Sequence, residues 1–321
     1  MRVLVAGGAG FIGSHVCERL LMREIEVLCL DNFATGKPAN IAHLQGSSGF
    51  EFIHADVVHA PAVRVDKILH LASPASPVDY DRLPIETMRA NALGTWRLLD
   101  IAGETGAALI FTSTSEVYGD PLVHPQPETY WGNVDPIGPR SCYDESKRFA
   151  EALIMATRRS AGVQANIVRL FNTYGPRMRV DDGRAIPELM TAALRGSPMV
   201  VHGDGNQTRS FCYVDDMVEG LLSVALDADL DGEVFNIGNR AEIKIRQLAE
   251  QIQSAFGSSS TIAFDERRPG DPERRRPDIS KIQARYGWQP KIELAEGLRL
   301  TAKAFREELD RAVPPRAVTI V

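Results

Sequence analysis

Tyr143 and Lys147 stand four residues apart, within a stretch whose apolar periodicity predicts a helix over 143–160. Residues at this spacing lie on one face of a helix, one turn apart. A free tyrosine has a pKa of about 10, so a neighbouring ammonium that favours the phenolate would help it act as a base near neutrality. The pair therefore indicates proton transfer, although the same spacing also occurs in helices that carry no chemistry.

A run of hydroxyl residues that ends in an acid, Thr112 to Glu116, follows a predicted strand at 109–111. Open α/β sheets bind their ligands beyond the carboxyl ends of their strands, which is where this run lies. Ser115 and Glu116 are therefore candidate site residues. The alternative is that they cap the strand end and face solvent.

A glycine-rich turn follows the first apolar run, with Gly7, Gly10 and Gly13 at GxxGxxG spacing. Such a turn lets the backbone approach a pyrophosphate, whose oxygens meet free amides at a helix N-terminus. Asp31 comes about 20 residues later, where its carboxylate would accept hydrogen bonds from an adenosine ribose and repel a 2′-phosphate. Packing alone explains many glycine turns, but glycines and Asp31 together predict a dinucleotide site that prefers NAD to NADP.

Short β-rich runs alternate with longer stretches of helical periodicity, and this alternation predicts a parallel sheet covered by helices. The runs are 3–5, 27–30, 52–54, 68–71, 109–111, 168–171 and 234–237. We also predict a helix over 82–103, with Met88, Leu93, Trp96 and Leu99 on one side, that covers the sheet together with the helix over 143–160.

The second half of the chain is looser and richer in glycine and proline, which suits a smaller lobe. The predicted fold class is therefore α/β, a doubly wound parallel Rossmann sheet with a smaller interleaved C-terminal α/β substrate lobe. The NAD-binding domain is assigned residues 1–171 plus 209–238, the substrate lobe 172–208 plus 239–312, and a frayed tail 313–321.

Bulk composition argues against several classes of protein. The net charge of −6 argues against a non-specific nucleic-acid surface. The cysteines lack CxxC spacing and predict reduced thiols in a cytoplasmic protein. No run approaches the roughly 20 apolar residues of a membrane helix, and the N-terminus does not resemble a signal peptide. We therefore expect no metal, no nucleic acid and no membrane partner.

Several motifs together resemble the extended short-chain dehydrogenase/reductase superfamily over nearly the whole chain. They are GGAGFIG at 7–13, HLAS at 70–73, TSEVYG at 114–119, the YxxxK pair and RLFNTYGP at 169–176. The resemblance implies a Rossmann domain for NAD, a C-terminal lobe for a nucleotide sugar, and a homodimer formed through two helices of each subunit. The cofactor contacts it implies are Gly7, Gly10, Phe11, Ile12, Gly13, Asp31, Asn32, Asp56, Val57, Leu71, Tyr143 and Lys147.

Within the superfamily, the segments 70–80, 114–148 and 203–216 most resemble the UDP-glucuronate decarboxylases. The implied chemistry begins with hydride transfer from sugar C4 to NAD⁺ while Tyr143 accepts the hydroxyl proton. The resulting β-keto acid loses CO2, the enolate is protonated at C5, and the hydride returns to C4. UDP-glucuronate would thus become UDP-xylose, and the cofactor would end as it began.

The same resemblance implies further roles. Ser115 would hydrogen-bond near the C4 oxygen, Glu116 would orient the ring or a water, and Arg275 would assist decarboxylation or supply a proton. Asn172 and Arg209 would contact the diphosphate, where arginine suits bidentate recognition. Arg89 is a candidate for the sugar carboxylate, with a surface arginine as the alternative.

The chain also departs from the family pattern. Ala185-Ile186-Pro187-Glu188 stands where an apolar pair and Ser-Asn are usual, and Ser146 replaces a common glycine. TDP-linked sugars or unusual uronates therefore stay open. Ser115-Glu116 replaces the Asp-Glu pair of dehydratases, which shifts weight away from dehydration. An NDP-sugar 4-epimerase or 4,6-dehydratase remains the alternative enzyme, and a redox-silent NAD-binding protein the alternative class.

Overall fold

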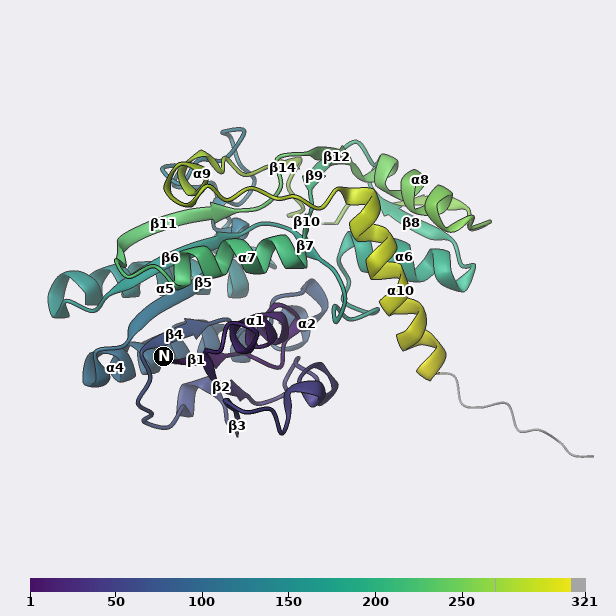
Figure 1. Ribbon diagram of the computed structural model, residues 1–321. Helices are drawn as coiled ribbons and strands as arrows, with labels where there is room; N and C mark the ends of the chain where they lie inside the picture. Colours follow the sequence, from purple (N-terminus) through teal and green to yellow (C-terminus); the bar gives the residue numbers. More distant parts are fainter. Residues whose placement is uncertain (269, 313–321) are drawn as a thin grey trace, which may run out of the picture.

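Seven parallel strands form the large sheet in the computed structural model, which describes residues 1–268 and 270–312 (Figure 1). They are β1 (Arg2–Ala6), β2 (Glu26–Asp31), β3 (Phe50–His54), β4 (Lys67–His70), β5 (Ala108–Thr114), β6 (Ala165–Leu170) and β11 (Asp231–Ile237). Their order is β11-β6-β5-β4-β1-β2-β3. The chain order reverses between β1 and β4, which makes their carboxyl ends the switch point at which such sheets bind ligands. The predicted doubly wound parallel sheet is confirmed.

Helices cover both faces of this sheet, and for this reason its strands are apolar on both sides. In β1, Val3 and Val5 lie in one core, and Leu4 and Ala6 lie in the other. The covering helices are α1 (Phe11–Leu21) and α7 (Val214–Ala225) on one face, and α4 (Thr95–Thr105) and α5 (Ser141–Ala161) on the other.

The predicted helix over 82–103 is confirmed in its extent, because residues 84–105 are helical throughout, but not in its regularity. A π-helical turn at Ala90–Gly94 joins α3 (Pro84–Arg89) to α4, and α2 (Pro77–Arg82) is a separate helix. Wider turns change which residues face the sheet. As a result Met88, Leu93 and Trp96 are exposed, and of the four predicted inward residues only Leu99 is buried.

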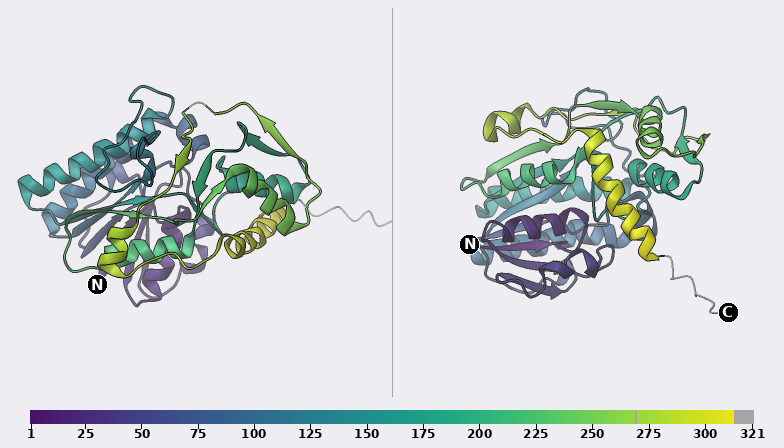
Figure 2. Two further views of the ribbon diagram at one scale, coloured as in Figure 1. Left: turned by 90° about the horizontal axis from the view of Figure 1, so that it is seen from above. Right: turned by 45° about the vertical axis from the view of Figure 1, so that its right-hand side comes forward.

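Within the described residues, the second half of the chain adds three small sheets and four helices (Figure 2). Three of the helices lie beyond one end of the large sheet, whereas α9 (Ser280–Tyr286) packs against β11 at its edge (Figure 1). The strands are β7 (Thr173–Tyr174) with β10 (Cys212–Tyr213), β8 (Met199–His202) with β13 (Ile262–Asp265), and β9 (Thr208–Ser210) between β12 (Glu242–Lys244) and β14 (Arg274–Arg275). The helices are α6 (Ala185–Arg195), α8 (Ile245–Phe256), α9 (Ser280–Tyr286) and α10 (Leu294–Ala312).

One hydrophobic core joins the two halves, because the cluster under α1 and α7 continues into residues such as Leu189, Leu248 and Phe305. The predicted lobe boundaries stay a prediction, and the predicted tail 313–321 lies outside the described residues. Within residues 1–268 and 270–312, no helix combines the length and apolarity that crossing a membrane requires.

Candidate active site

A cavity of about 620 Å³ opens at the carboxyl ends of β1, β4, β5 and β6, and residues of α6, β8 and β9 line its other side. This volume lies in the usual range for a ligand pocket, roughly 300–1,000 Å³. Because it opens at these strand ends, the cavity lies where a doubly wound sheet is expected to bind a ligand.

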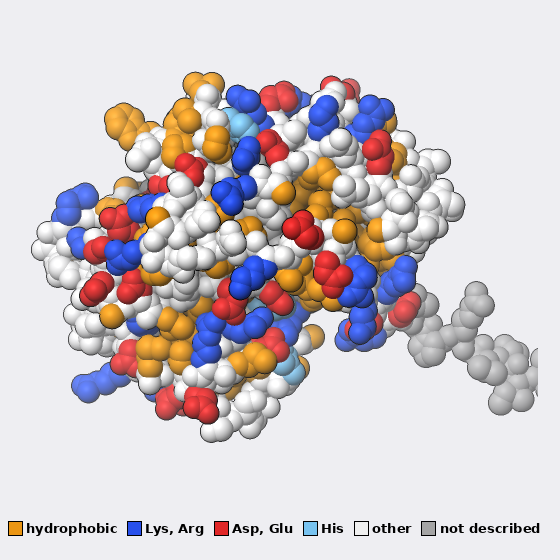
Figure 3. Space-filling view, turned by 45° about the horizontal axis from the view of Figure 1, so that its top comes forward, with side chains coloured by type: hydrophobic (Ala, Val, Ile, Leu, Met, Phe, Trp, Pro, Cys, Tyr) orange, Lys and Arg blue, Asp and Glu red, His pale blue; other side chains and the backbone are white. Residues whose placement is uncertain are grey.

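Figure 3 shows one face of the molecule, on which basic and acidic side chains are intermixed rather than gathered by sign.

The glycine-rich turn forms one wall of the cavity. Gly7 has a φ of +84°, and a Cβ on Gly13 would lie 2.1 Å from the carbonyl oxygen of Gly7. Only glycine fits at these two positions, and the backbone stays open to a ligand. The cofactor candidates that line this wall are Gly7, Gly10, Phe11, Ile12, Gly13 and Leu71. The turn therefore fits the pyrophosphate of a dinucleotide.

The candidates for the adenosine end gather at the carboxyl ends of β2 and β3, outside the lining of this cavity. Asp31 accepts hydrogen bonds from the amide nitrogens of Ala9, at 3.0 Å, and Phe33, at 2.8 Å. Asn32 donates to Asp56 over 3.0 Å, and Val57 is buried next to Asp56. Asp31 thus also ties the glycine turn to β2, a function that the sequence did not indicate.

Tyr143 and Lys147 both project from α5 into the cavity lining. The Tyr143 ring stacks on Tyr80, with centroids 5.5 Å apart, and the Lys147 ammonium donates to the carbonyl oxygen of Thr112 over 2.9 Å. Burial raises the pKa of Tyr143 to about 12 and lowers the pKa of Lys147 to about 7. Burial is the largest cause of both shifts, so the expectation that Lys147 favours the phenolate stays a prediction.

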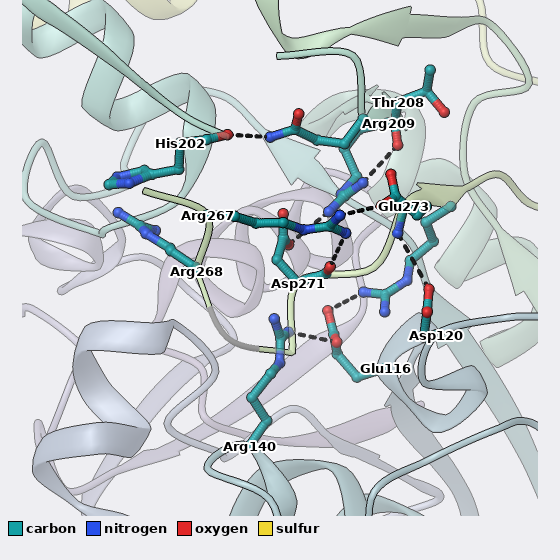
Figure 4. A network of polar contacts seen from close by, with 12 residues as sticks. Glu116, Asp120, Arg140, His202, Thr208, Arg209, Arg267, Arg268, Asp271 and Glu273 are labelled. Atoms are coloured by element: carbon teal, nitrogen blue, oxygen red, sulfur yellow. Dashed lines mark hydrogen bonds and ion pairs between the residues drawn. The ribbon is translucent and has the colours of Figure 1, made fainter. Parts of the chain in front are cut away.

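Ser115 and Glu116 follow β5 directly, and both line the cavity. Two arginines hold the Glu116 carboxylate: Arg140 donates to Oε2 over 2.5 Å, and Arg275 donates to Oε1 (Figure 4 labels Glu116 and Arg140). Burial alone would raise the pKa of Glu116, but these two guanidiniums lower it to about 2. Glu116 is therefore a fixed negative charge, and its two arginines limit its freedom to orient a ring or a water.

The candidates for the diphosphate, Asn172 and Arg209, line the cavity. Arg209 is buried and donates to Asp271 over 2.6 Å and to the carbonyl oxygen of Thr208 over 2.7 Å, as Figure 4 shows. These bonds fix the side chain without a ligand's help. The site therefore presents an arginine that is already positioned for an anion.

Arg89 does not join the other candidates. It is exposed at the end of α3 and does not line the cavity. The cavity residues that the sequence reasoning missed include Tyr80, Arg140 and Arg184. The sequence places two of them next to motifs, since Arg140 immediately precedes the helix of the YxxxK pair, and Arg184 ends the segment DDGR at 181–184, directly before the departure at 185–188. Only the fold shows that all three face the same cavity as Tyr143.

Comparisons with known proteins place the chain in a family. The family model described as GDP-mannose 4,6 dehydratase matches residues 4–301. The chain is 50% identical over 309 residues to UDP-glucuronic acid decarboxylase 1 of Arabidopsis thaliana, covering 96% of this chain and 71% of that protein.

Two solved structures have closely similar folds. One is the dTDP-glucose 4,6-dehydratase of Streptomyces venezuelae with NAD bound, with a TM-score of 0.88 and 30% identity over 97% of this chain and 98% of that one. The other is the UDP-glucuronic acid 4-epimerase of Bacillus cereus in complex with UDP-glucuronic acid and NAD, with a TM-score of 0.87 and 30% identity over 96% of this chain and 100% of that one. This chain belongs to the extended short-chain dehydrogenase/reductase family of nucleotide-sugar enzymes and, within it, to the family of the UDP-glucuronic acid decarboxylases.

Proposed function

We propose that this protein converts UDP-glucuronate to UDP-xylose and CO2, with NAD as a recycled cofactor. The observation that carries the proposal is that Tyr143, Ser115 and Arg275 line one cavity although they come from α5, the end of β5 and β14. Family membership supports it, because relatives at about half identity act on UDP-glucuronic acid according to their names.

The glycine turn and the buried Lys147 fit a nicotinamide dinucleotide, whose pyrophosphate would lie on Gly7 to Gly13. When bound, NAD supplies a hydride acceptor for sugar C4 and a hydride donor after CO2 has left. Lys147 would hold the nicotinamide ribose. Asp31, Asn32, Asp56 and Val57 would surround the adenosine.

Tyr143 would take the proton from the C4 hydroxyl, with Ser115 hydrogen-bonded to the same oxygen. A phenol with a pKa near 12 stays protonated at neutrality, so oxidation needs positive charge near Tyr143 that favours the phenolate when the complex forms. Once C4 is a ketone, the C5 carboxylate belongs to a β-keto acid and leaves as CO2. Arg275 would stabilise the enolate charge, or supply the proton to C5 through water.

The substrate end of the cavity would hold the nucleoside diphosphate through Arg209 and Asn172. Each of the buried arginines at this end has a carboxylate partner: Arg209 has Asp271, and Arg275 has Glu116. A diphosphate would therefore meet donors held in place beforehand, which lowers the entropy lost on binding.

The direct test is to incubate the purified protein with NAD⁺ and UDP-glucuronate, and to analyse the nucleotide sugars while CO2 is trapped. We expect UDP-xylose and CO2 in equal amounts. UDP-galacturonate without CO2 would identify a 4-epimerase. Conversion of a dTDP-hexose to its 4-keto-6-deoxy product would instead identify a 4,6-dehydratase.

We also propose a homodimer that pairs through the outer face of α3, α4 and α5. This face exposes Ile85, Met88, Leu93, Trp96 and Phe149, an unusual gathering of large apolar side chains. Burying them against a second copy would remove them from water. Sedimentation of the purified protein tests the proposed homodimer.

The expected cytoplasmic location stays a prediction.

A further inference from the structure

The Glu116 carboxylate lies between two arginines that approach it from different parts of the chain. Arg140 comes from the segment before α5, and Arg275 comes from β14 in the second half. Each takes a different carboxylate oxygen, and Arg275 also donates to the carbonyl oxygen of Gly119 over 3.0 Å. Only 3% of the Arg275 side chain is exposed, so its place depends on these acceptors.

Arg140 also fixes the start of the helix that carries Tyr143. Its carbonyl oxygen accepts the amide protons of Tyr143, at 3.0 Å, and Asp144, at 3.1 Å. One residue therefore links the first turn of α5 to the carboxylate that holds Arg275. A side chain from the cofactor half thus reaches, through Glu116, an arginine of the second half (Figure 4).

Two guanidiniums outweigh the effect of burial on Glu116. Burial raises the pKa of Glu116, and the charges of Arg140 and Arg275, together with the hydrogen bond from Arg275, lower it. The other titratable groups that interact with Glu116 are Arg209, Asp144, Tyr143 and Tyr80. Without Arg140, the buried carboxylate would keep one close cation and gain a tendency to be protonated.

We infer that Arg140 is a positioning residue for decarboxylation: it keeps Glu116 ionised and turned toward Arg275, so that Arg275 is in place when the 4-keto acid forms. The decarboxylation step rests on the proposed function. The arrangement of Arg140, Glu116 and Arg275 does not. Arg140 does not contact the reacting atoms in the proposed reaction, and its effect passes through Glu116.

The test compares Arg140→Gln and Arg140→Lys with the wild type. Misplacing Arg275 should lower kcat for CO2 release in the Gln variant by about 100-fold, with KM for UDP-glucuronate within about threefold. A carboxylate whose pKa rises loses its charge at a higher pH, so the acid limb of the kcat profile should move to higher pH. The Lys variant should recover about tenfold in kcat, because a charge returns without the forked geometry.

A matched control is Arg299→Gln, which removes an exposed arginine that pairs with Glu296 over 2.8 Å on α10 and does not line the cavity. It should leave kcat and the acid limb unchanged. An acid limb that does not move in Arg140→Gln, or a fall confined to KM, would overturn the inference. A simple structural role would lower the melting temperature without moving the pH profile.

A second measurement does not depend on catalysis. In a thermal double-mutant cycle, Arg140→Gln and Glu116→Gln should be non-additive, since each removes the same contact. Additive losses would contradict the pairing. If the wild type makes no UDP-xylose, only the proposed function is contradicted. The double-mutant cycle would still measure the interaction between Arg140 and Glu116. Should Arg140→Gln not fold, the Lys variant carries the same comparisons.

Discussion

The cofactor side and the substrate side of the cavity bury their cations in different ways. On the cofactor side, the Lys147 ammonium donates to a backbone carbonyl and, among the described residues, forms no ion pair. On the substrate side, Arg209 and Arg275 each have a carboxylate partner within hydrogen-bonding distance. Burial accordingly lowers the pKa of Lys147 to about 7, whereas the arginines stay charged.

This difference indicates what each side requires of its ligand. An unpaired buried lysine is poised between charged and neutral, so a nearby proton transfer or ligand charge can change its state. Pre-paired arginines are fixed in both charge and direction, and they suit recognition of a permanent anion. The difference therefore predicts that one side responds to proton movement and that the other recognises charge.

The largest expected effect tests the proton-transfer side. Tyr143→Phe should lower kcat for UDP-xylose formation by about 1,000-fold or more, because the phenol acts on the proton removed in the transition state. KM should change little. Steady-state assays with calorimetric binding of UDP-glucuronate measure both. Tyr130→Phe is the control, since its hydroxyl accepts from the Leu122 amide away from the cavity lining. A loss below tenfold in Tyr143→Phe would remove it from the mechanism.

The two sides also differ in how far the sequence predicts them. The glycine turn and the Tyr143–Lys147 pair depend on local spacing, and both predictions place their residues in the cavity. The Arg140–Glu116 and Arg275–Glu116 contacts join residues 24 and 159 positions apart, and no periodicity encodes such a distance. The family resemblance suggested Arg275, but nothing in the chain indicated which carboxylate would hold it.

The errors in the predictions also come from tertiary contacts, which local spacing does not encode. The π-helical turn at Ala90–Gly94 is closely packed, because a Cβ on Gly94 would lie 2.6 Å from Val57 Cγ1, and apolar spacing does not report such a contact. The pKa of Tyr143 depends on burial, which spacing does not report. Local motifs thus predicted residues that line the cavity, and tertiary contacts determine the charge states of these residues.

A second test concerns the charge-recognition side. In Arg275→Ala, oxidation should continue while CO2 release falls about 100-fold, since an electrostatic partner of the enolate is gone. Bound NADH should therefore build up, and stopped-flow absorbance with parallel CO2 detection would follow both. The control is Arg274→Ala, its exposed neighbour in the chain. Normal CO2 release without NADH build-up would show that Arg275 serves only to hold the fold.

The smallest expected effect concerns stability. It tests whether the charge of the buried Lys147 ammonium lowers the stability of the folded protein because no carboxylate pairs with it. Its pKa is about 7 in the folded protein, against roughly 10.4 for an unfolded chain. Below pH 7 both states carry the proton, and the full cost of a buried charge weakens the folded state. Between these two values the unfolded chain alone binds the proton, so stability rises with pH and the cost disappears. Replacing the charge with an apolar side chain should therefore help most at low pH.

Lys147→Met should accordingly raise the melting temperature at pH 6 by about 3 °C relative to the wild type, and should change it less at pH 9. Differential scanning calorimetry at both values measures the difference, with Lys303→Met, an exposed lysine on α10, as the control. An equal change at both pH values would mean that Lys147 keeps its proton. The Glu151 carboxylate, which raises the pKa of Lys147, would then compensate the buried ammonium as fully as Glu116 and Asp271 compensate their arginines. In that case the two sides of the cavity would not differ in how they hold charge.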